Sequence, residues 1–178
     1  VGGNVWQRLW NENKQPHEIF NTLDNNKLKK GVVRILFSLD AGKIPPILLD
    51  LIQKSPTNWN WFIRCHPFHL DNLDELVLKL KKYSNVDEYH SSRALLPQVL
   101  QNIEAHVTGW SAVVFDAKEF GIKSILCHSS AKIFFEKLIE NNDAIYLSNT
   151  PDIIAHIDAN YKKYKIKNTN MKYPMFHF

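Results

Sequence analysis

The chain has 178 residues and a mass of 20.7 kDa, the usual size of one folded domain. Its residues are 44% hydrophobic, 12% aromatic and 22% charged, a composition that excludes a disordered, collagen-like or low-complexity protein. No apolar run reaches the roughly 18 residues that a membrane-spanning helix needs, and the N-terminus lacks the layout of a signal peptide. Cys65 and Cys127 lie in separate apolar stretches and indicate neither a disulfide framework nor a zinc site. We therefore expect a soluble, cytoplasmic domain.

The net charge of +4 is concentrated near the C-terminus. Residues 161–178 contain five lysines and no carboxylate, whereas residues 1–160 contain 17 basic and 18 acidic residues, a net −1. A nucleic-acid-binding protein generally spreads its positive charge over the folded body. We therefore expect no nucleic-acid partner and interpret residues 161–178 as a basic, aromatic tail.

The first 30 residues have a helical pattern that differs from the rest of the chain. Apolar residues at helical spacing predict one helix around residues 5–10 and a second over residues 17–29. The chain begins at Val1 without a methionine, so we expect it to be a piece of a longer protein.

From residue 31 onward, strand and helix patterns alternate. Short β-branched or aromatic runs predict strands over 32–37, 59–64, 85–89, 105–108, 122–127 and 144–147. Helical periodicity and capping residues predict helices over 47–53, 71–80, 92–100, 111–120 and 130–139, and a last helix that starts at Thr150. Such alternation implies right-handed crossovers and a parallel sheet covered on both faces. We predict an α/β fold, a doubly wound, Rossmann-like domain of about six strands over residues 31–160.

Ligands of such a fold bind beyond the carboxyl ends of the strands, so the strand-to-helix loops are the candidate site. The first of these loops, residues 38–46, has one glycine and neither a G-x-G-x-x-G nor a P-loop pattern. A dehydrogenase or a nucleoside triphosphatase is therefore not indicated. Lys43 is a weak candidate for contacting a phosphate, and a solvated loop lysine is the more common case.

The second loop follows a predicted buried strand and reads Arg64-Cys65-His66-Pro67-Phe68-His69. Because Pro67 holds the preceding residue in extended geometry, we expect His66 to be aimed from the sheet edge, where it can donate to a phosphate oxygen. By strand alternation, Arg64 is expected to point the same way and to add a charge-assisted contact. The spacing of His66 and His69 suits a metal only on a helix, which Pro67 prevents, so no metal is expected.

The fourth loop, Thr108-Gly109-Trp110-Ser111, ends a predicted strand on a glycine turn and opens a helix. Unpaired backbone N–H groups at such a turn make an anion site, to which Ser111 adds a hydroxyl. Asp116, five residues further along, is placed to accept hydrogen bonds from a ribose. Taken alone, these residues are better interpreted as a helix cap and a surface acid.

Together, the R-x-H-P pattern and the run T-G-W-S-A-V-V-F-D-A-K-E-F-G-I-K-S-I resemble the C-terminal half of GT-B glycosyltransferases. The resemblance is closest to bacterial capsule and lipopolysaccharide enzymes that carry HP and S motifs, and it covers roughly residues 31–150. It implies that His66 acts in catalysis by contacting the donor phosphate, and that Asp116 lies near the donor ribose. The other residues implied at the donor phosphate are Arg64, Gly109 and Ser111, with Ser129 and Ser130 as weaker candidates.

The resemblance also implies a function, that of binding a nucleotide-sugar donor in an enzyme that makes bacterial surface polysaccharide, with no metal or other cofactor. Residues 1–30, which begin with Val1-Gly2-Gly3, would be the hinge and leading helices after a missing N-terminal half. That half would bind the saccharide acceptor and supply the general base. The parent enzyme is expected in the cytoplasm, with peripheral association at the inner face of the cytoplasmic membrane.

Two other functions stay open. A UDP-sugar 2-epimerase would share the fold, but such enzymes usually show a glycine pair and an acidic pair where this chain has Trp110-Ser111-Ala112 and Phe115-Asp116. A non-catalytic partner-binding module would use its aromatic residues, among them Tyr173, Phe176 and Phe178, as an interface. The nucleotide base, the sugar and the acceptor also stay open.

Overall fold

The computed structural model describes residues 33–170, and the side chains of residues 33–160. The two helices predicted before residue 30 lie outside the described residues. Of the predicted tail, residues 161–170 continue the last helix and residues 171–178 lie outside the described part.

Six parallel strands form the centre of the domain: β1 (Val33–Ser38), β2 (Trp59–Arg64), β3 (Val86–Asp87), β4 (Ala105–Thr108), β5 (Ser124–Leu126) and β6 (Ala144–Tyr146). Their order in the sheet is β3-β2-β1-β4-β5-β6, which is the doubly wound order of a Rossmann-like fold. The predicted fold class is therefore confirmed. The direction of winding reverses between β1 and β4, so the switch point of the sheet lies at their carboxyl ends.

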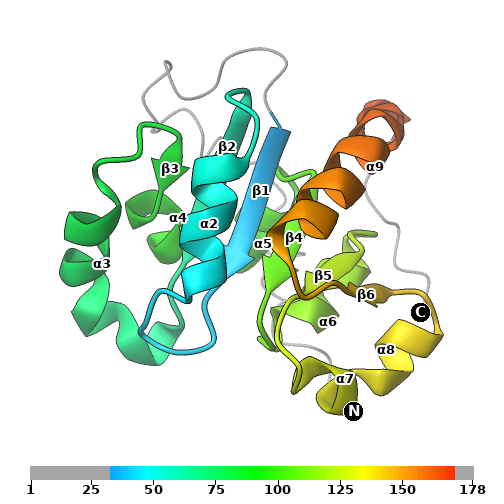
Figure 1. The fold of residues 1–178 in the computed structure, drawn as a ribbon, viewed down its shortest axis with the longest axis horizontal. Helices are drawn as coiled ribbons and strands as arrows, with labels where there is room; N and C mark the ends of the chain where they lie inside the picture. Colours follow the sequence, from blue (N-terminus) through cyan, green and yellow to red (C-terminus); the bar gives the residue numbers. More distant parts are fainter. Residues whose placement is uncertain (1–32, 171–178) are drawn as a thin grey trace.

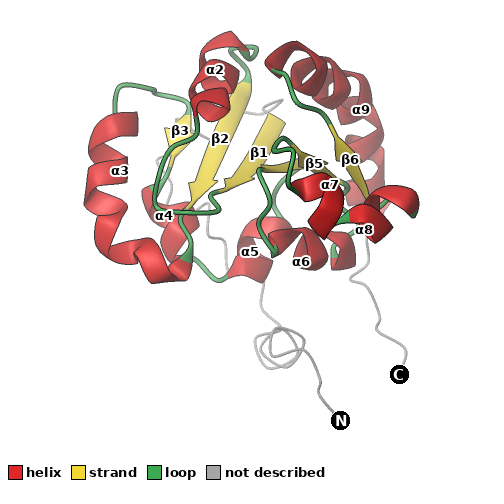
Figure 2. Cartoon of the chain, turned by 60° about the horizontal axis from the view of Figure 1, so that its bottom comes forward, coloured by secondary structure: helices red, strands yellow, loops and turns green. Residues whose placement is uncertain are grey.

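Helices cover both faces of this sheet, as Figure 1 and Figure 2 show. One face is covered by α2 (Pro46–Lys54), α3 (Leu73–Leu80) and α9 (Thr150–Asn170). The other face is covered by α4 (Tyr89–Arg93), α5 (Leu96–Leu100) and α6 (Val113–Glu119), with α7 (Ala131–Phe134) and α8 (Glu136–Glu140) beside β5 and β6. A short 3-10 helix, η3 (Pro67–Asn72), links β2 to α3.

The strands bury both of their faces because successive side chains alternate between the two helical layers. Ile35 and Trp61 are fully buried in the cluster that includes residues of α2, α3 and α9. Leu36 and Phe62, the next residue of each strand, pack instead against residues of α5 and α6. This explains why the strands are continuous apolar runs in the sequence.

Several predicted helix boundaries differ from the structure because side chains bind the backbone there. Ser92 was expected to open one long helix over 92–100, but its hydroxyl lies 3.2 Å from the carbonyl of Ile63. The segment instead forms two short helices, and Pro97 in the first turn of α5 lacks the N–H that would continue α4. The predicted cap at Asp71 is also wrong, since Asp71 lies inside η3 and α3 begins at Leu73.

The helix predicted over 130–139 is likewise divided, into α7 and α8, at Phe135, whose backbone leaves the helical region. Within residues 33–170, no helix combines the length and the apolar character needed to cross a bilayer.

Candidate functional site

Four loops leave the carboxyl ends of β2, β1, β4 and β5 and lie at one edge of the sheet, the lower edge in Figure 1. We call it the carboxyl edge. In the order of the strands, the loops carry His66, Asp40, the pair Trp110 and Ser111, and His128. Neighbouring strands lie about 4.8 Å apart, so β2 and β5, which carry the first and last of these loops, are about 14 Å apart in the sheet. The predicted site residues on these loops are therefore brought to one edge.

His66 follows β2 and has the extended backbone that Pro67 imposes, with φ −64° and ψ 139°, as predicted. Its Nδ1 accepts a hydrogen bond from the backbone N–H of Phe68 at 3.3 Å. The neutral imidazole must therefore carry its proton on Nε2. The ring stacks on the ring of Phe68, with centroids 5.3 Å apart and planes 21° apart. His66 is thus held in one tautomer and one orientation, with a donor N–H on Nε2.

Arg64 lies elsewhere than predicted. Its Nη1 donates to the backbone carbonyls of Ser91 and Ala94, at 2.6 and 2.8 Å, on the face of the sheet that α4 and α5 cover. Burial lowers the pKa of the Arg64 guanidinium to about 10. The predicted charge-assisted contact with a phosphate therefore competes with these two carbonyls for the guanidinium of Arg64. Arg64 ties β2 to the junction between α4 and α5.

Asp40 was not among the predicted site residues, and its side chain occupies the turn between β4 and α6. Its Oδ1 accepts from the backbone N–H of Trp110 at 3.0 Å and lies 3.1 Å from the hydroxyl of Thr108. Burial raises the pKa of Asp40, and these two hydrogen bonds and the nearby His128 partly offset that rise. The sheet order brings Asp40 to this turn, because β1 and β4 are neighbours although these residues are 70 positions apart.

Gly109 is required at this turn by the approach of Asp40. A Cβ on Gly109 would lie only 2.1 Å from Asp40 Oδ2, so any other residue would push the carboxylate away. The glycine was predicted as part of a phosphate-binding turn. In the structure, the space beside Gly109 is occupied by the carboxylate of Asp40.

Ser111 lies next to this turn, but fewer of the N–H groups are free than predicted. The N–H of Trp110 is paired with Asp40, and the N–H of Ser111 donates to Thr108 Oγ1 at 3.2 Å. The Ser111 hydroxyl oxygen accepts from the N–H of Val113 at 3.4 Å, so its own proton remains to donate. The helix α6 begins at Val113 and not at Ser111. Ser111 is therefore a partly buried hydroxyl at the carboxyl edge.

Asp116 lies on α6 and is half-buried. Burial raises the pKa of its carboxyl group, and the positive charge of Arg64 acts in the opposite direction. The carboxylate of Asp116 on α6 thus interacts with the guanidinium of Arg64 at the end of β2. The contact of Asp116 with a ribose stays a prediction.

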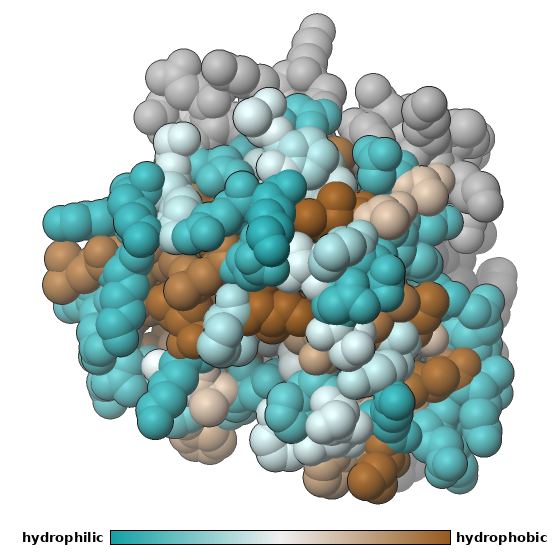
Figure 3. Space-filling model, viewed as in Figure 1, coloured by the Kyte–Doolittle hydropathy of each residue, from teal (hydrophilic) through white to brown (hydrophobic). Residues whose placement is uncertain are grey.

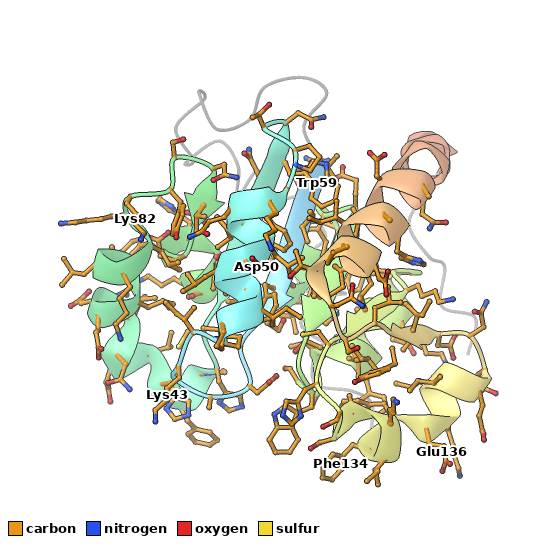
Figure 4. All side chains as sticks on the ribbon, viewed as in Figure 1. Lys43, Asp50, Trp59, Lys82, Phe134 and Glu136 are labelled. Atoms are coloured by element: carbon orange, nitrogen blue, oxygen red, sulfur yellow. The ribbon has the colours of Figure 1, made fainter. Side chains whose placement is uncertain are left out.

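The weaker candidates also follow strands at the carboxyl edge. Lys43 is exposed in the loop after β1, near the lower edge in Figure 4. Ser129 is exposed after β5, and the backbone N–H of Ser130 donates to His128 Nδ1 at 3.2 Å. That bond fixes the His128 proton on Nε2, as Phe68 does for His66.

An aromatic cluster, which the sequence analysis did not predict as a group, lies between the ends of β4 and β5. Trp110 has its ring centroid 6.4 Å from that of His128 and 5.3 Å from that of Phe134. Trp110 is 45% exposed and Phe134 is 62% exposed. Phe134 projects at the lower edge in Figure 4, where Figure 3 shows apolar surface. The loop after β5 thus meets the loop after β4.

Neither cysteine is suited to nucleophilic chemistry. Both are free thiols, and the Sγ of Cys127 donates to the carbonyl of Thr108 at 3.2 Å. Burial, reinforced by the charge of Asp40, raises the pKa of Cys127 to about 12, so the thiolate is not formed near neutral pH. In the described part of the chain, no group of three or more His, Cys, Asp or Glu side chains is placed to hold a metal ion.

No family model and no curated protein matches the sequence. A solved structure of UDP-GlcNAc 2-epimerase from Neisseria meningitidis bound to UDP-GlcNAc is similar in fold, with a TM-score of 0.54 and 14% sequence identity. The match covers 94% of this chain and 46% of that chain. The likeness shows a shared Rossmann-like fold. The chain spans less than half the length of that enzyme.

Proposed function

We propose that this domain binds a nucleotide sugar at its carboxyl edge, as the donor-binding half of a glycosyltransferase that makes bacterial capsule or lipopolysaccharide. The observation that carries the proposal is the placement of His66 and Ser111 beyond the ends of β2 and β4. His66 can donate its proton on Nε2, and Ser111 can donate its hydroxyl proton. The loop that follows β1 lies between them, because β1 lies between β2 and β4 in the sheet. The similar fold of an enzyme whose solved structure holds UDP-GlcNAc supports this class of ligand.

In the proposed reaction, an acceptor hydroxyl attacks the anomeric carbon of the donor sugar. The bond between that carbon and the nucleotide phosphate breaks, and the nucleotide leaves with the electron pair while a general base takes the hydroxyl proton. The Nε2–H of His66 and the hydroxyl of Ser111 would stabilise the negative charge that grows on the leaving phosphate. No metal or other cofactor enters this scheme.

The acceptor site and the general base are proposed to come from a second half of the enzyme, because the chain spans only 46% of the similar structure. Asp116 is proposed to bind the donor ribose, and Arg64 to support the site by holding the α4–α5 junction. We further propose that the whole enzyme works in the cytoplasm, at the inner face of the membrane.

The donor site can be tested by titrating this chain with CMP, CDP, UDP and GDP and monitoring its tryptophan fluorescence. One nucleotide should bind saturably, and His66→Ala and Ser111→Ala should each weaken its binding about tenfold, because each removes a hydrogen bond to a charged group. His156→Ala serves as the matched control, since His156 is a half-buried histidine on α9. Unchanged affinity in both site variants would overturn the site. A stable dimer that binds none of the four nucleotides would favour a partner-binding module.

A UDP-sugar 2-epimerase is the second candidate, favoured by the identity of the similar solved structure. Incubation of the protein with UDP-GlcNAc, followed by NMR of the sugar protons, separates the two functions. Epimerised sugar in the absence of any acceptor would replace the glycosyltransferase proposal.

A further inference from the structure

We propose that Trp110, Asp40 and His128 form a subsite for a pyranose ring at the carboxyl edge, between the ends of β1, β4 and β5. The inference rests on the proposed function, because the ring would be the sugar of the nucleotide sugar bound along this edge. It adds the part of the site that would recognise the sugar itself.

Trp110 offers an apolar surface that its neighbours hold in place. Its ring contacts His128 and Phe134, and its backbone N–H is bound by Asp40. These contacts leave 45% of the residue exposed. A large exposed aromatic side chain gains free energy when an apolar surface covers it, and one face of a pyranose is lined with C–H groups. The indole can therefore serve as the platform of a sugar site.

The two polar groups beside this platform complement sugar hydroxyls. Both hydrogen bonds from the turn to Asp40 end on Oδ1, so Oδ2 is left to accept a hydrogen bond from a ligand hydroxyl. His128 is exposed and has its Nδ1 occupied by the N–H of Ser130, so its Nε2–H is a donor. A sugar hydroxyl both donates and accepts, so it can complement the acceptor Oδ2 of Asp40 and the donor Nε2–H of His128. An aromatic surface with a few convergent polar groups is typical of small-molecule sites.

The charge of Asp40 decides which part of a nucleotide sugar lies here. A carboxylate already occupies the N–H of Trp110, so a phosphate on the same turn would meet a like charge. An uncharged polyhydroxyl ring meets no such repulsion. The phosphates are then left to His66 and the hydroxyl of Ser111, and the sugar to the exposed part of Trp110 that His128 and Phe134 leave uncovered.

Saturation-transfer difference NMR of this chain tests the subsite directly, because it reports separately on each part of a bound ligand. The probes are UDP-GlcNAc, CDP-glucose and GDP-mannose, whose sugar rings carry no charge. We expect one of them to show saturation of both its nucleoside protons and its sugar-ring protons. Saturation of the nucleoside protons alone would overturn the subsite and leave the proposed function standing. No saturation of any of the three would overturn both.

Variants then assign the subsite to its residues. Trp110→Ala should abolish saturation of the sugar protons and leave that of the nucleoside protons. It should also lower the affinity for the nucleotide sugar about fivefold. Trp110→Phe should retain most of the sugar signal, which protects the test if the alanine variant is unstable. Phe115→Ala is the matched control, because Phe115 is an aromatic residue of similar exposure, 53%, on α6. Sugar saturation that survives in folded Trp110→Ala would overturn the assignment.

Discussion

The contact between Gly109 and Asp40 gives a prediction whose size follows from the structure. In Gly109→Ala, the new methyl group would lie 2.1 Å from Asp40 Oδ2 and 3.1 Å from its Cγ. Ordinary contacts are 3.4–4 Å long, so the contact with Oδ2 would be too short by more than 1 Å. The carboxylate must therefore move by about that distance, and the 3.0 and 3.1 Å bonds to Trp110 and Thr108 cannot both survive.

A hydrogen bond to a charged group contributes about 1.5–3 kcal/mol to stability. Asp40 is only half-buried, so a displaced carboxylate regains hydration and the net loss corresponds to about one such bond. We expect Gly109→Ala to lower the free energy of unfolding by about 2 kcal/mol. In an Asp40→Ala background the added methyl group meets no carboxylate, so the same substitution should cost almost nothing.

Urea unfolding followed by far-UV circular dichroism measures this as a double-mutant cycle of the wild type, the two single variants and the double variant. Gly42→Ala in both backgrounds is the control, because a Cβ there would meet His69 and Asn72 and not Asp40. An equal cost of Gly109→Ala in both backgrounds would refute the explanation of this glycine by the carboxylate.

Two further predictions concern buried polar groups that support the sheet. Burial lowers the pKa of His106 from 6.5 to about 3. As the pH falls below 6.5, this histidine is protonated in the unfolded chain but not in the folded one, so the folded state loses stability. The free energy of unfolding in urea should fall by about 2 kcal/mol between pH 7 and pH 5 in the wild type, and this fall should be missing in His106→Gln. Equal falls in the two proteins would contradict the role given to His106. Arg64→Lys should cost about 1–2 kcal/mol, because an ammonium replaces the guanidinium that binds two carbonyls, and should speed amide exchange over residues 89–100. Unchanged exchange there would show that Arg64 does not hold the α4–α5 junction.

β1, β2 and β4 were predictable because the fold buries most of their residues, on both faces of the sheet. The ranges 59–64 and 105–108 agree residue for residue with β2 and β4. The strand predicted over 85–89 is only two residues long, because Asp87 accepts a hydrogen bond from the N–H of Ser91 and starts α4 early. Such competition between a side chain and the backbone leaves no periodic signal in the sequence.

The candidate site was predictable as a set of loops but not as a set of contacts. The geometry of His66 followed from Pro67, which acts on its direct neighbour in the chain. Asp40 could not be found in this way, since its partners lie 68 and 70 positions away and depend on β1 and β4 being adjacent. The same holds for the cluster of Trp110, His128 and Phe134, which requires the loops after β4 and β5 to meet.

A carboxylate at the switch point should act in opposite directions on the two parts of a nucleotide sugar. Asp40→Asn preserves an oxygen that can accept from Trp110 and Thr108, removes the negative charge and places an N–H₂ group where Oδ2 was. A nucleoside diphosphate alone should then bind more tightly at neutral pH, because the like charge is gone, whereas the affinity gained from the sugar should fall. Burial raises the pKa of Asp40, so protonation at lower pH should tighten binding of the diphosphate to the wild type and not to the variant. The phosphate of the free ligand titrates equally in both experiments, so the difference between the two affinity profiles from pH 8 to pH 5 reports the charge of Asp40 together with its interactions with the bound phosphate and His128. Parallel pH profiles would show that this carboxylate lies outside the reach of the bound phosphates.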